Sequence, residues 1–153
     1  MKSLTTKETH FMDINELQKQ WKEDSYIDPD NLHMESLKIP QLHSKYYEIF
    51  NNTLLLKKKA QDEKNKIRLK KYEYYTGKAD PEEYKDVYQK KIRDKEHLQN
   101  CMNADEDISK ASLKIEYYDT ILDYLSDILK MIHNRSFQIK NSLEYQKYIS
   151  GYG

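Results

Sequence analysis

The sequence predicts an all-α protein, and three properties of its composition support this. A single valine disfavours a sheet-dominated fold, because strands are enriched in β-branched residues. Only three glycines and three prolines interrupt long runs of good helix formers. Apolar residues make up 37% of the 153-residue chain, against about 45–50% in an average protein. A chain this polar buries little apolar surface, so we expect helices that complete their core by self-association.

The same composition argues against several classes of function. Three glycines do not suffice for a glycine-rich phosphate loop or a dinucleotide-binding fingerprint. No apolar run approaches the ~18 residues of a membrane span, and the N-terminus lacks the apolar stretch of a signal peptide. A single cysteine allows no internal disulfide. We therefore expect no membrane association and a reducing compartment.

The first residues predict a mobile N-terminal tail over 1–12, followed by one helical domain over 13–153. Asp13 and Glu16 have the spacing of a capping box, in which each side chain caps the other residue's backbone N–H. They predict a first helix that ends near Asp24.

A short helix and a long helix are expected next. Asp28 and Pro29 read as an N-cap and a first helical residue, and Pro40 interrupts the short helix that they begin. No proline or glycine occurs over 41–76, which predicts one long helix that Gly77 ends as its C-terminal cap.

Three further helices are expected in the second half of the chain. Asp80 and Pro81 predict a helix to about Asn100. The weak apolar side of that helix would consist of Tyr84, Val87, Tyr88, Ile92 and Leu98. A C-terminal amphipathic helix pair follows, over about 104–133 and 136–149, and Gly151 ends it.

Charge is segregated along the chain although the formal net charge is zero. The basic segment, residues 57–71, holds eight basic and two acidic residues, whereas residues 105–127 hold seven acidic and two basic residues. Helix geometry, at ~100° per residue, places some residues of the basic segment and the following Tyr75 in one row along a helix edge. The row consists of Lys57, Gln61, Lys64, Arg68, Lys71 and Tyr75. A neighbouring apolar line, which we expect to rest on the protein, consists of Leu56, Ala60, Ile67 and Tyr74.

Cations followed by tyrosines are typical of single-strand binding, because cations neutralise phosphates and aromatic rings stack on unpaired bases. The sequence therefore predicts DNA binding by the helix over 41–78. The candidate DNA-binding residues are Lys57, Lys64, Arg68, Lys70, Lys71, Tyr75 and Lys78. The alternative is a solvated helix face with lysines in loose ion pairs.

The helix over 111–132 carries a continuous apolar stripe with acidic residues opposite it. Two interpretations are open, a core within one chain and a subunit interface, and we favour the interface because the rest of the chain is so polar. Residues 104–151 are thus the expected oligomerisation region. Its candidate contact residues are Tyr118, Ile121, Leu122, Leu125, Ile128, Leu129 and Ile132.

The C-terminal segment from Arg135 to Tyr148 is again basic and aromatic. It is either a docked terminal helix, which we favour, or a second binding element. Its basic and aromatic positions include Phe137, Lys140, Tyr145 and Lys147.

The sequence shows few candidate metal-binding or catalytic residues. His97 and Cys101 have the i, i+4 spacing of two metal ligands, but a zinc site needs two more, and no second pair is present. No Ser/His/Asp or Cys/His set stands out. We expect no metal, no cofactor and no enzymatic activity; a metal-dependent or other enzyme is the least favoured alternative.

Six short segments carry a resemblance to a known family through their order and spacing. They are residues 17–18 (LQ), 24–28 (DSYID), 42–46 (LHSKY), 74–78 (YYTGK), 104–107 (ADED) and 135–140 (RSFQIK). Between about residues 17 and 151 the chain resembles the UvsY family of phage recombination mediators. In that family a Lys-x-Arg pair before the Tyr-Tyr-Ser-Gly segment contributes to DNA binding. Lys71 matches its arginine, while Leu69, flanked by Arg68 and Lys70, matches its lysine.

The resemblance implies a small helical protein that forms a ring-shaped homo-oligomer, a heptamer in the family. It implies binding to single-stranded DNA, to a RecA-like recombinase of the UvsX type and to the phage single-strand-binding protein. The implied role is to promote recombinase assembly on coated DNA in homologous recombination, repair and recombination-dependent replication, in the cytoplasm of the infected host cell. The alternative function is a helical scaffold or adaptor that binds only protein partners.

Overall fold

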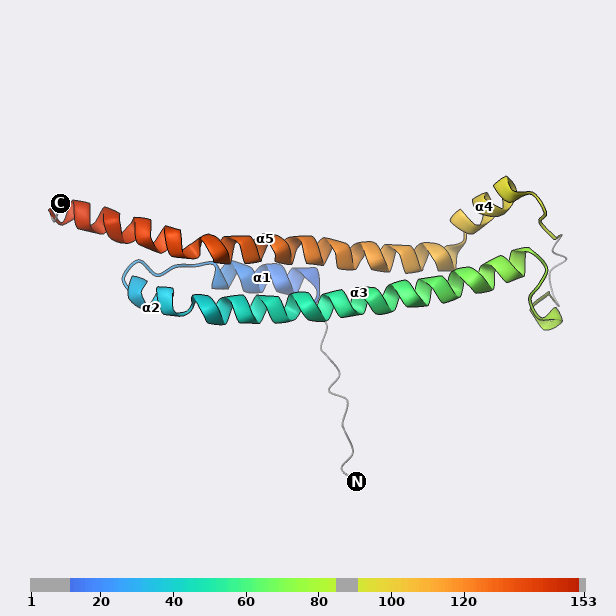
Figure 1. Cartoon of the computed structure of the whole chain (residues 1–153), viewed down its shortest axis with the longest axis horizontal. Helices are drawn as coiled ribbons and strands as arrows, with labels where there is room; N and C mark the ends of the chain where they lie inside the picture. The colour runs from blue at the N-terminus through green and yellow to red at the C-terminus, as the bar shows by residue number, and fades with distance from the viewer. Residues whose placement is uncertain (1–11, 85–90, 152–153) are drawn as a thin grey trace, which may run out of the picture. The chain divides into compact units, whose positions relative to one another are not determined.

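A computed structural model describes residues 12–84 and 91–151, and every regular element within these ranges is helical. The elements, in chain order, are α1 (Ile14–Asp24), α2 (Leu32–Leu37), α3 (Ile39–Tyr75), the 3₁₀ helix η1 (Pro81–Tyr84), α4 (Lys95–Asn103) and α5 (Glu106–Ile149) (Figure 1). The predicted all-α class is confirmed over these residues. The predicted tail over 1–12 falls almost wholly on residues outside the described ranges.

The described residues form two compact units. The first unit combines residues 12–53 with residues 123–151, and the second unit contains the described residues from 54 to 122. Both long helices, α3 and α5, contribute one part to each unit. Among the described helices, none is long and apolar enough to cross a lipid bilayer.

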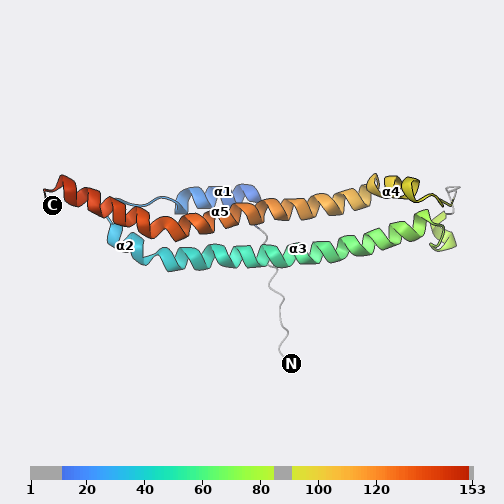
Figure 2. The same ribbon diagram turned by 45° about the horizontal axis from the view of Figure 1, so that its top comes forward.

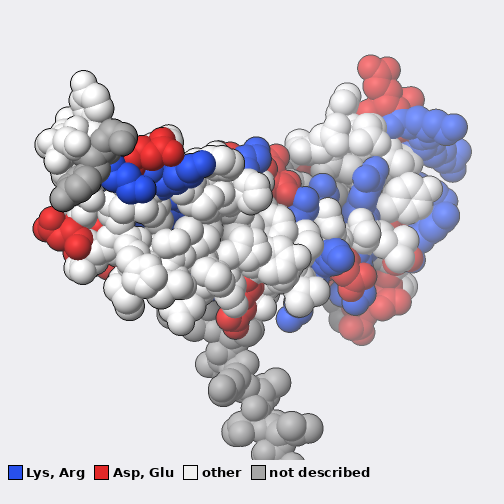
Figure 3. All heavy atoms as spheres, turned by 60° about the vertical axis from the view of Figure 1, so that its left-hand side comes forward, with Lys and Arg blue, Asp and Glu red and all other residues white. Residues whose placement is uncertain are grey.

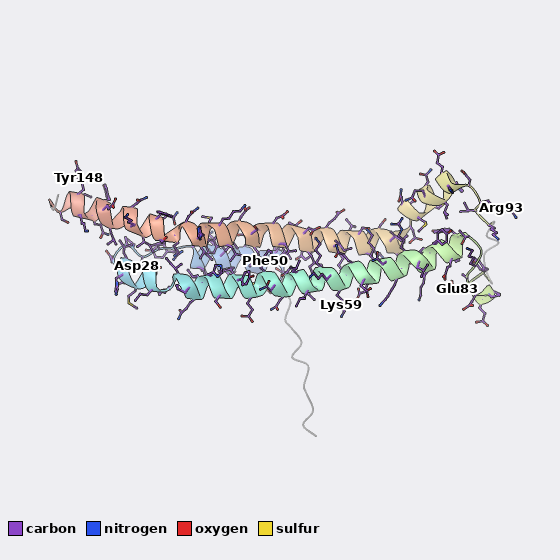
Figure 4. The ribbon with its side chains drawn as sticks, viewed as in Figure 1. Asp28, Phe50, Lys59, Glu83, Arg93 and Tyr148 are labelled. Carbon is purple, nitrogen blue, oxygen red and sulfur yellow. The ribbon has the colours of Figure 1, made fainter. Side chains whose placement is uncertain are left out.

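In the first unit α1 lies beside α3 and α5, as both ribbon views show (Figure 2). Trp21 of α1 meets Tyr46 of α3 edge to face, with ring centroids 5.3 Å apart. The largest fully buried side chains of this unit come from all three helices; they are Leu17, Tyr46, Leu125, Ile128 and Ile132. Phe50 lies on the side of α3 that faces these helices (Figure 4). The first unit therefore has a three-helix core.

Arg135 of α5 holds the connection between α1 and α2 in place through hydrogen bonds and an ion pair. Its Nη2 donates to Glu35 Oε2 at 2.9 Å and to the carbonyl of Tyr26 at 3.0 Å, and its Nη1 donates to the carbonyl of Asp24 at 3.2 Å. Only 3% of Arg135 is exposed. The Gln146 side chain, about three turns further along α5, donates to the carbonyl of Pro29 at 3.0 Å. A buried cation thus satisfies backbone carbonyls that no helix pairs.

In the second unit, the latter part of α3 pairs with the first part of α5, and α4 precedes α5. Its interior is smaller and contains Ala60, Met102, Ile108, Tyr118, Ile121 and Leu122. The glycine predicted to end the long helix does so: Gly77 has a φ of +77°, a left-handed conformation that glycine adopts without a Cβ clash.

Several predicted helix boundaries are confirmed. Asp13 caps α1 by accepting the N–H of Glu16 at 2.8 Å. The predicted long helix over 41–76 is α3, Ile39–Tyr75. Pro40 is its second residue, where a missing N–H costs nothing.

Two predictions about the second half of the chain are wrong. The C-terminal helix pair is one continuous helix, α5, because Arg135 is anchored in the interior and neither proline nor glycine interrupts the chain near it. The predicted helix from Pro81 to Asn100 is not continuous: residues 91–94 are not helical, and α4 begins only after Asp94, which caps it by accepting the N–H of His97 at 3.2 Å. Val87 and Tyr88, predicted on its apolar side, lie outside the described residues.

The predicted start of the short helix is also wrong. The Asp28 carboxylate accepts the N–H of Asp30 at 3.0 Å and the side-chain amide of Asn31 at 2.8 Å, so it closes a turn over Pro29. The helix α2 begins three residues later, with Asn31 at its N-cap position. An aspartate side chain can stabilise a turn as well as a helix start, and here the turn forms.

Candidate nucleic-acid interface

The basic segment lies within α3, in the second unit. Five of its cations have no ion pair in the described part of the chain; they are Lys58, Lys59, Lys64, Arg68 and Lys70. Lys59 lies on the side of α3 that faces away from α5 (Figure 4). On the receding part of the surface in Figure 3, many Lys and Arg side chains gather with Asp and Glu side chains among them, whereas the nearer part is mostly uncharged. The segment therefore presents uncompensated positive charge.

Two cations of the predicted row contact α5 within the same unit. Lys57 forms an ion pair with Asp119, and Lys71 forms ion pairs with Asp107 at 2.8 Å and Asp105 at 3.4 Å. A third cation, Lys66, pairs with Asp62 one turn away on α3. The row thus differs from its prediction: Lys57 and Lys71 are partly covered by α5, and Lys64 and Arg68 are the members that keep their charge uncompensated.

Asp105 links the end of α3 to the start of α5. Its carboxylate accepts the hydroxyl of Tyr75 at 2.7 Å and, as the cap of α5, the N–H of Ile108 at 3.2 Å. Burial of Asp105 opposes its ionisation, but these hydrogen bonds and the Lys71 ammonium together lower its pKa. Burial and the bond to Asp105 raise the pKa of Tyr75 to about 12. The Tyr75 hydroxyl is thus committed to this network, although its ring was a candidate for DNA contact.

The hydrogen bond from Lys71 to Asp107 raises the pKa of the Lys71 ammonium, so this cation stays charged. A phosphate that bound Lys71 would compete with two carboxylates. Lys71, the residue that matches the family's arginine, is therefore weakened as a phosphate ligand by its own neighbours.

A hollow of about 470 Å³ lies between α3 and α4, which we name the α3–α4 groove. It is lined by Asn65, Arg68, Leu69, Tyr72, Lys95, Leu98, Gln99 and Met102. A second hollow of about 430 Å³ shares Arg68, Gln99 and Met102 with it and also contacts Lys64 and Glu116. Sequence reasoning singled out Lys64 and Arg68 but missed the residues of α4, because no linear spacing relates Lys95 or Gln99 to the basic segment.

The tyrosines at the end of α3 differ in how available their rings are. Tyr74 stacks on Tyr84 with ring centroids 5.2 Å apart, and the Tyr84 hydroxyl donates to the Tyr74 carbonyl at 2.7 Å. Tyr72 is 41% exposed, and the Lys78 ammonium lies 5.8 Å from the centre of its ring. Tyr72 is the ring of this cluster that combines exposure with neighbouring cations, and Lys78 is the predicted site residue that accompanies it.

The apolar stripe is packed within the single chain. Six of its seven candidate contact residues are at most 8% exposed; they are Tyr118, Ile121, Leu122, Leu125, Ile128 and Ile132. Leu129 is half-buried. These side chains form the interiors of the two units, so the structure gives them a role as core. A role for them between subunits stays a prediction.

The C-terminal segment of α5 is docked at its start and exposed beyond. Arg135 and Ile139 are 3% exposed, whereas Phe137, Tyr145 and Tyr148 are 63%, 64% and 81% exposed. Tyr148 lies near the C-terminal end of α5 (Figure 4). The expected docking therefore holds for the first turns of the segment, and its last turns are open to solvent.

His97 and Cys101, whose i, i+4 spacing could suit two metal ligands but at which we expect no metal, are in contact. Cys101 Sγ lies 3.7 Å from His97 Nε2. In the described residues, no group of three or more His, Cys, Asp or Glu side chains converges as a metal site would require. This pair alone is too small for a zinc site.

A family model and a known protein that match this chain point to the same family. Residues 20–152 match the family described as "Recombination, repair and ssDNA binding protein UvsY". The recombination protein uvsY of Enterobacteria phage T4 is 28% identical over 144 residues, which cover 92% of this chain and 99% of that protein.

Crystal structures of the bacteriophage T4 recombination mediator protein UvsY have the same fold. One superposes with a TM-score of 0.78 and 23% identity over 91% of this chain and 98% of that chain. A second lattice form gives a TM-score of 0.77 over 90% of this chain and 98% of that chain.

Proposed function

This chain belongs to the UvsY family, and from that premise we propose that it is a phage recombination mediator that binds single-stranded DNA. Its partners are a RecA-like recombinase of the UvsX type and the phage single-strand-binding protein, in the infected host cell. The observation that carries the DNA-binding role is the uncompensated charge of α3 beside an exposed tyrosine, Tyr72.

Lys64, Arg68, Lys70 and Lys78 supply the phosphate contacts, with smaller contributions from Lys57 and Lys71. The two weaker cations already pair with carboxylates of α5, so binding a phosphate yields less net attraction. Four phosphate contacts per chain imply a slope of log K against log salt near −3. One chain alone is thus a weak and salt-sensitive binder.

A ring-shaped homo-oligomer, a heptamer as in the family, overcomes this weakness. Several copies that hold one strand act at high effective concentration, so their affinities multiply. Residues 104–151 supply the subunit contacts, and the exposed apolar side chains at the end of α5 add to the buried stripe as candidates. Sedimentation of the chain with and without an oligonucleotide gives the mass of the assembly.

The mediator acts without covalent chemistry. It holds the strand in a state that recombinase binds better than bare or coated DNA, which shifts the competition toward recombinase. Recombinase filaments should therefore nucleate faster on coated DNA when the mediator is present. Equal nucleation rates with and without it would contradict this mechanism.

A salt titration with single-stranded oligonucleotides tests the DNA-binding role. The variant K64Q/R68Q/K70Q removes three phosphate contacts and should flatten the salt slope by about 2, or 0.7 per contact. The matched control K22Q/K140Q/K147Q removes the same charge from exposed positions in the first unit and should change the slope less.

The pattern of results separates the alternatives. A loss confined to the control variant would move the site to the C-terminal segment of α5. A wild-type chain that binds no oligonucleotide at low salt would contradict DNA binding. Binding to an acidic protein partner in that case would support the scaffold function instead.

A further inference from the structure

The α3–α4 groove combines an apolar floor with a cationic rim. Leu69, Leu98 and Met102 supply aliphatic surface, and the half-exposed ring of Tyr72 lies among them. Arg68 from α3 and Lys95 from α4 line the same groove, and both are exposed. Among the described residues, no carboxylate lines this groove. An occupant of matching chemistry is flat, apolar on its faces and attached to negative charge.

We propose that the α3–α4 groove binds an unpaired base of single-stranded DNA, which stacks on Tyr72 while Arg68 and Lys95 hold the flanking phosphates. This inference rests on the proposed function and adds the base-binding site that a row of phosphate contacts lacks. It assigns α4 to the interface, through Lys95 and Gln99.

Size and charge favour a base over an apolar side chain of a protein partner. The groove's volume of about 470 Å³ falls within the ~300–1,000 Å³ of small-ligand sites. Two cations and no carboxylate at the rim match a phosphodiester on either side of the base. A nonpolar protein segment would gain nothing from those cations.

Lys78 completes the arrangement from the loop after α3. Its ammonium lies 5.8 Å from the centre of the Tyr72 ring, a weak contact near the limit for a cation–π pair. Lys78 is exposed, so it can exchange the ring for a phosphate. The approaching strand thus finds a third cation beside the ring on which its base would stack.

The exposed amides of Asn65 and Gln99 lie in the same lining. An amide offers two donors and an acceptor, and Gln99 uses one donor on Asn103 Oδ1 at 3.0 Å, so both side chains keep a donor and an acceptor for the edge of a base. Stacking is likewise tolerant of sequence, because every base has a flat aromatic face. The groove should therefore bind bases without strong sequence preference.

The test compares an oligo(dT) with an abasic oligonucleotide of equal length at low salt, using the full chain. Y72L keeps apolar surface but removes the ring, so it should bind oligo(dT) about 5- to 150-fold more weakly. It should bind the abasic strand as the wild type does. Y72F keeps the ring and should bind both strands normally. The control Y47L removes a tyrosine of similar exposure, 49% against 41%, from α3 in the first unit and should leave both affinities unchanged.

A second variant tests the rim. K95Q should weaken the binding of both oligonucleotides and flatten the salt slope by about 0.7, since it removes one phosphate contact. The matched variant K130Q, at an exposed lysine of α5 in the first unit, should leave the slope unchanged.

Each remaining outcome overturns the base site in a recognisable way. Equal losses of Y72L on oligo(dT) and on the abasic strand would mean that Tyr72 only supports the local fold. Normal DNA binding by Y72L, with lost binding to recombinase, would assign the groove to a protein. A wild-type chain that binds neither strand would contradict the proposed function together with the groove.

Discussion

The two units of the molecule differ in the interactions that join their helices. The first unit places three helices around large apolar side chains, such as Tyr46 and Leu125, which are 0% exposed. The second unit also buries apolar side chains, such as Ile121, and in addition joins α3 to α5 with ion pairs at Lys57, Lys71 and Lys114. Both units are held by burial, and the second unit adds partly exposed charge between its helices.

This difference indicates a division of roles. Buried apolar surface stabilises a fold strongly, whereas exposed ion pairs contribute about 0–1 kcal/mol each. A loosely committed cation can exchange its carboxylate for a phosphate at small cost. The first unit is therefore suited to maintain the fold, and the second unit is suited to bind a polyanion.

The largest effect should follow the loss of the buried cation in the first unit. R135M removes the buried cation from Glu35 and leaves that carboxylate only the partly exposed Lys38 ammonium, 3.3 Å from Oε1, so the change costs up to about 3–5 kcal/mol. The free energy of unfolding, measured by urea titration, should fall by that amount. DNA affinity per folded molecule should change little, because Arg135 lies outside the second unit.

The control for that variant is the double substitution R135M/E35M. It removes both charges and should recover part of the lost free energy of unfolding, although three backbone acceptors of Arg135 remain unpaired. A double variant that is less stable than R135M would show that the charge pair is not what anchors this corner.

A smaller effect should follow the release of a cation in the second unit. D107N removes the closest carboxylate from Lys71, so single-stranded DNA should bind a few-fold more tightly and the salt slope should steepen by up to about 0.7. The matched control E106Q removes the same charge from the same turn of α5. Equal gains from both variants would reflect net charge alone and would remove Lys71 from the interface.

Much of the fold follows from local signals in the sequence. Asp13 and Gly77 act where their chemistry predicts, because caps depend on neighbours within four residues. The continuity of α5 also has a local signal, since neither proline nor glycine occurs within it. The contact between Arg135 and Glu35, a hundred residues apart, does not follow from local signals.

The candidate site was harder to predict for the same reason. The sequence indicates that Lys64 and Arg68 share a helix edge, but it does not indicate that Asp105 and Asp107 cover Lys71. It also gives no sign that α4 brings Lys95 beside Tyr72. Charge segregation indicates which helix carries the basic segment, whereas ion pairs across helices decide which of its cations are available.

The smallest expected effect is on how the free energy of unfolding depends on pH, through one aspartate in each unit. Asp24 in the first unit and Asp105 in the second both have a lowered pKa, although burial alone would raise it. At Asp24, interactions with Lys45 and Tyr46 outweigh the effect of burial. At Asp105, hydrogen bonds from Tyr75 and the Ile108 N–H, together with Lys71, outweigh it. A lowered native pKa stabilises the fold above the unfolded value of about 3.9, and this contribution is lost as the pH falls through the native pKa.

D24N and D105N should therefore each reduce the loss in free energy of unfolding between pH 7 and pH 3. The control D127N, at a largely exposed carboxylate whose Lys130 partner is 3.9 Å away, should keep the wild-type pH dependence. Urea titrations at both pH values measure the difference. If D105N kept the wild-type dependence while D24N did not, the Tyr75–Asp105–Lys71 network would contribute nothing to the fold, and the second unit would retain Asp105 only as the cap of α5.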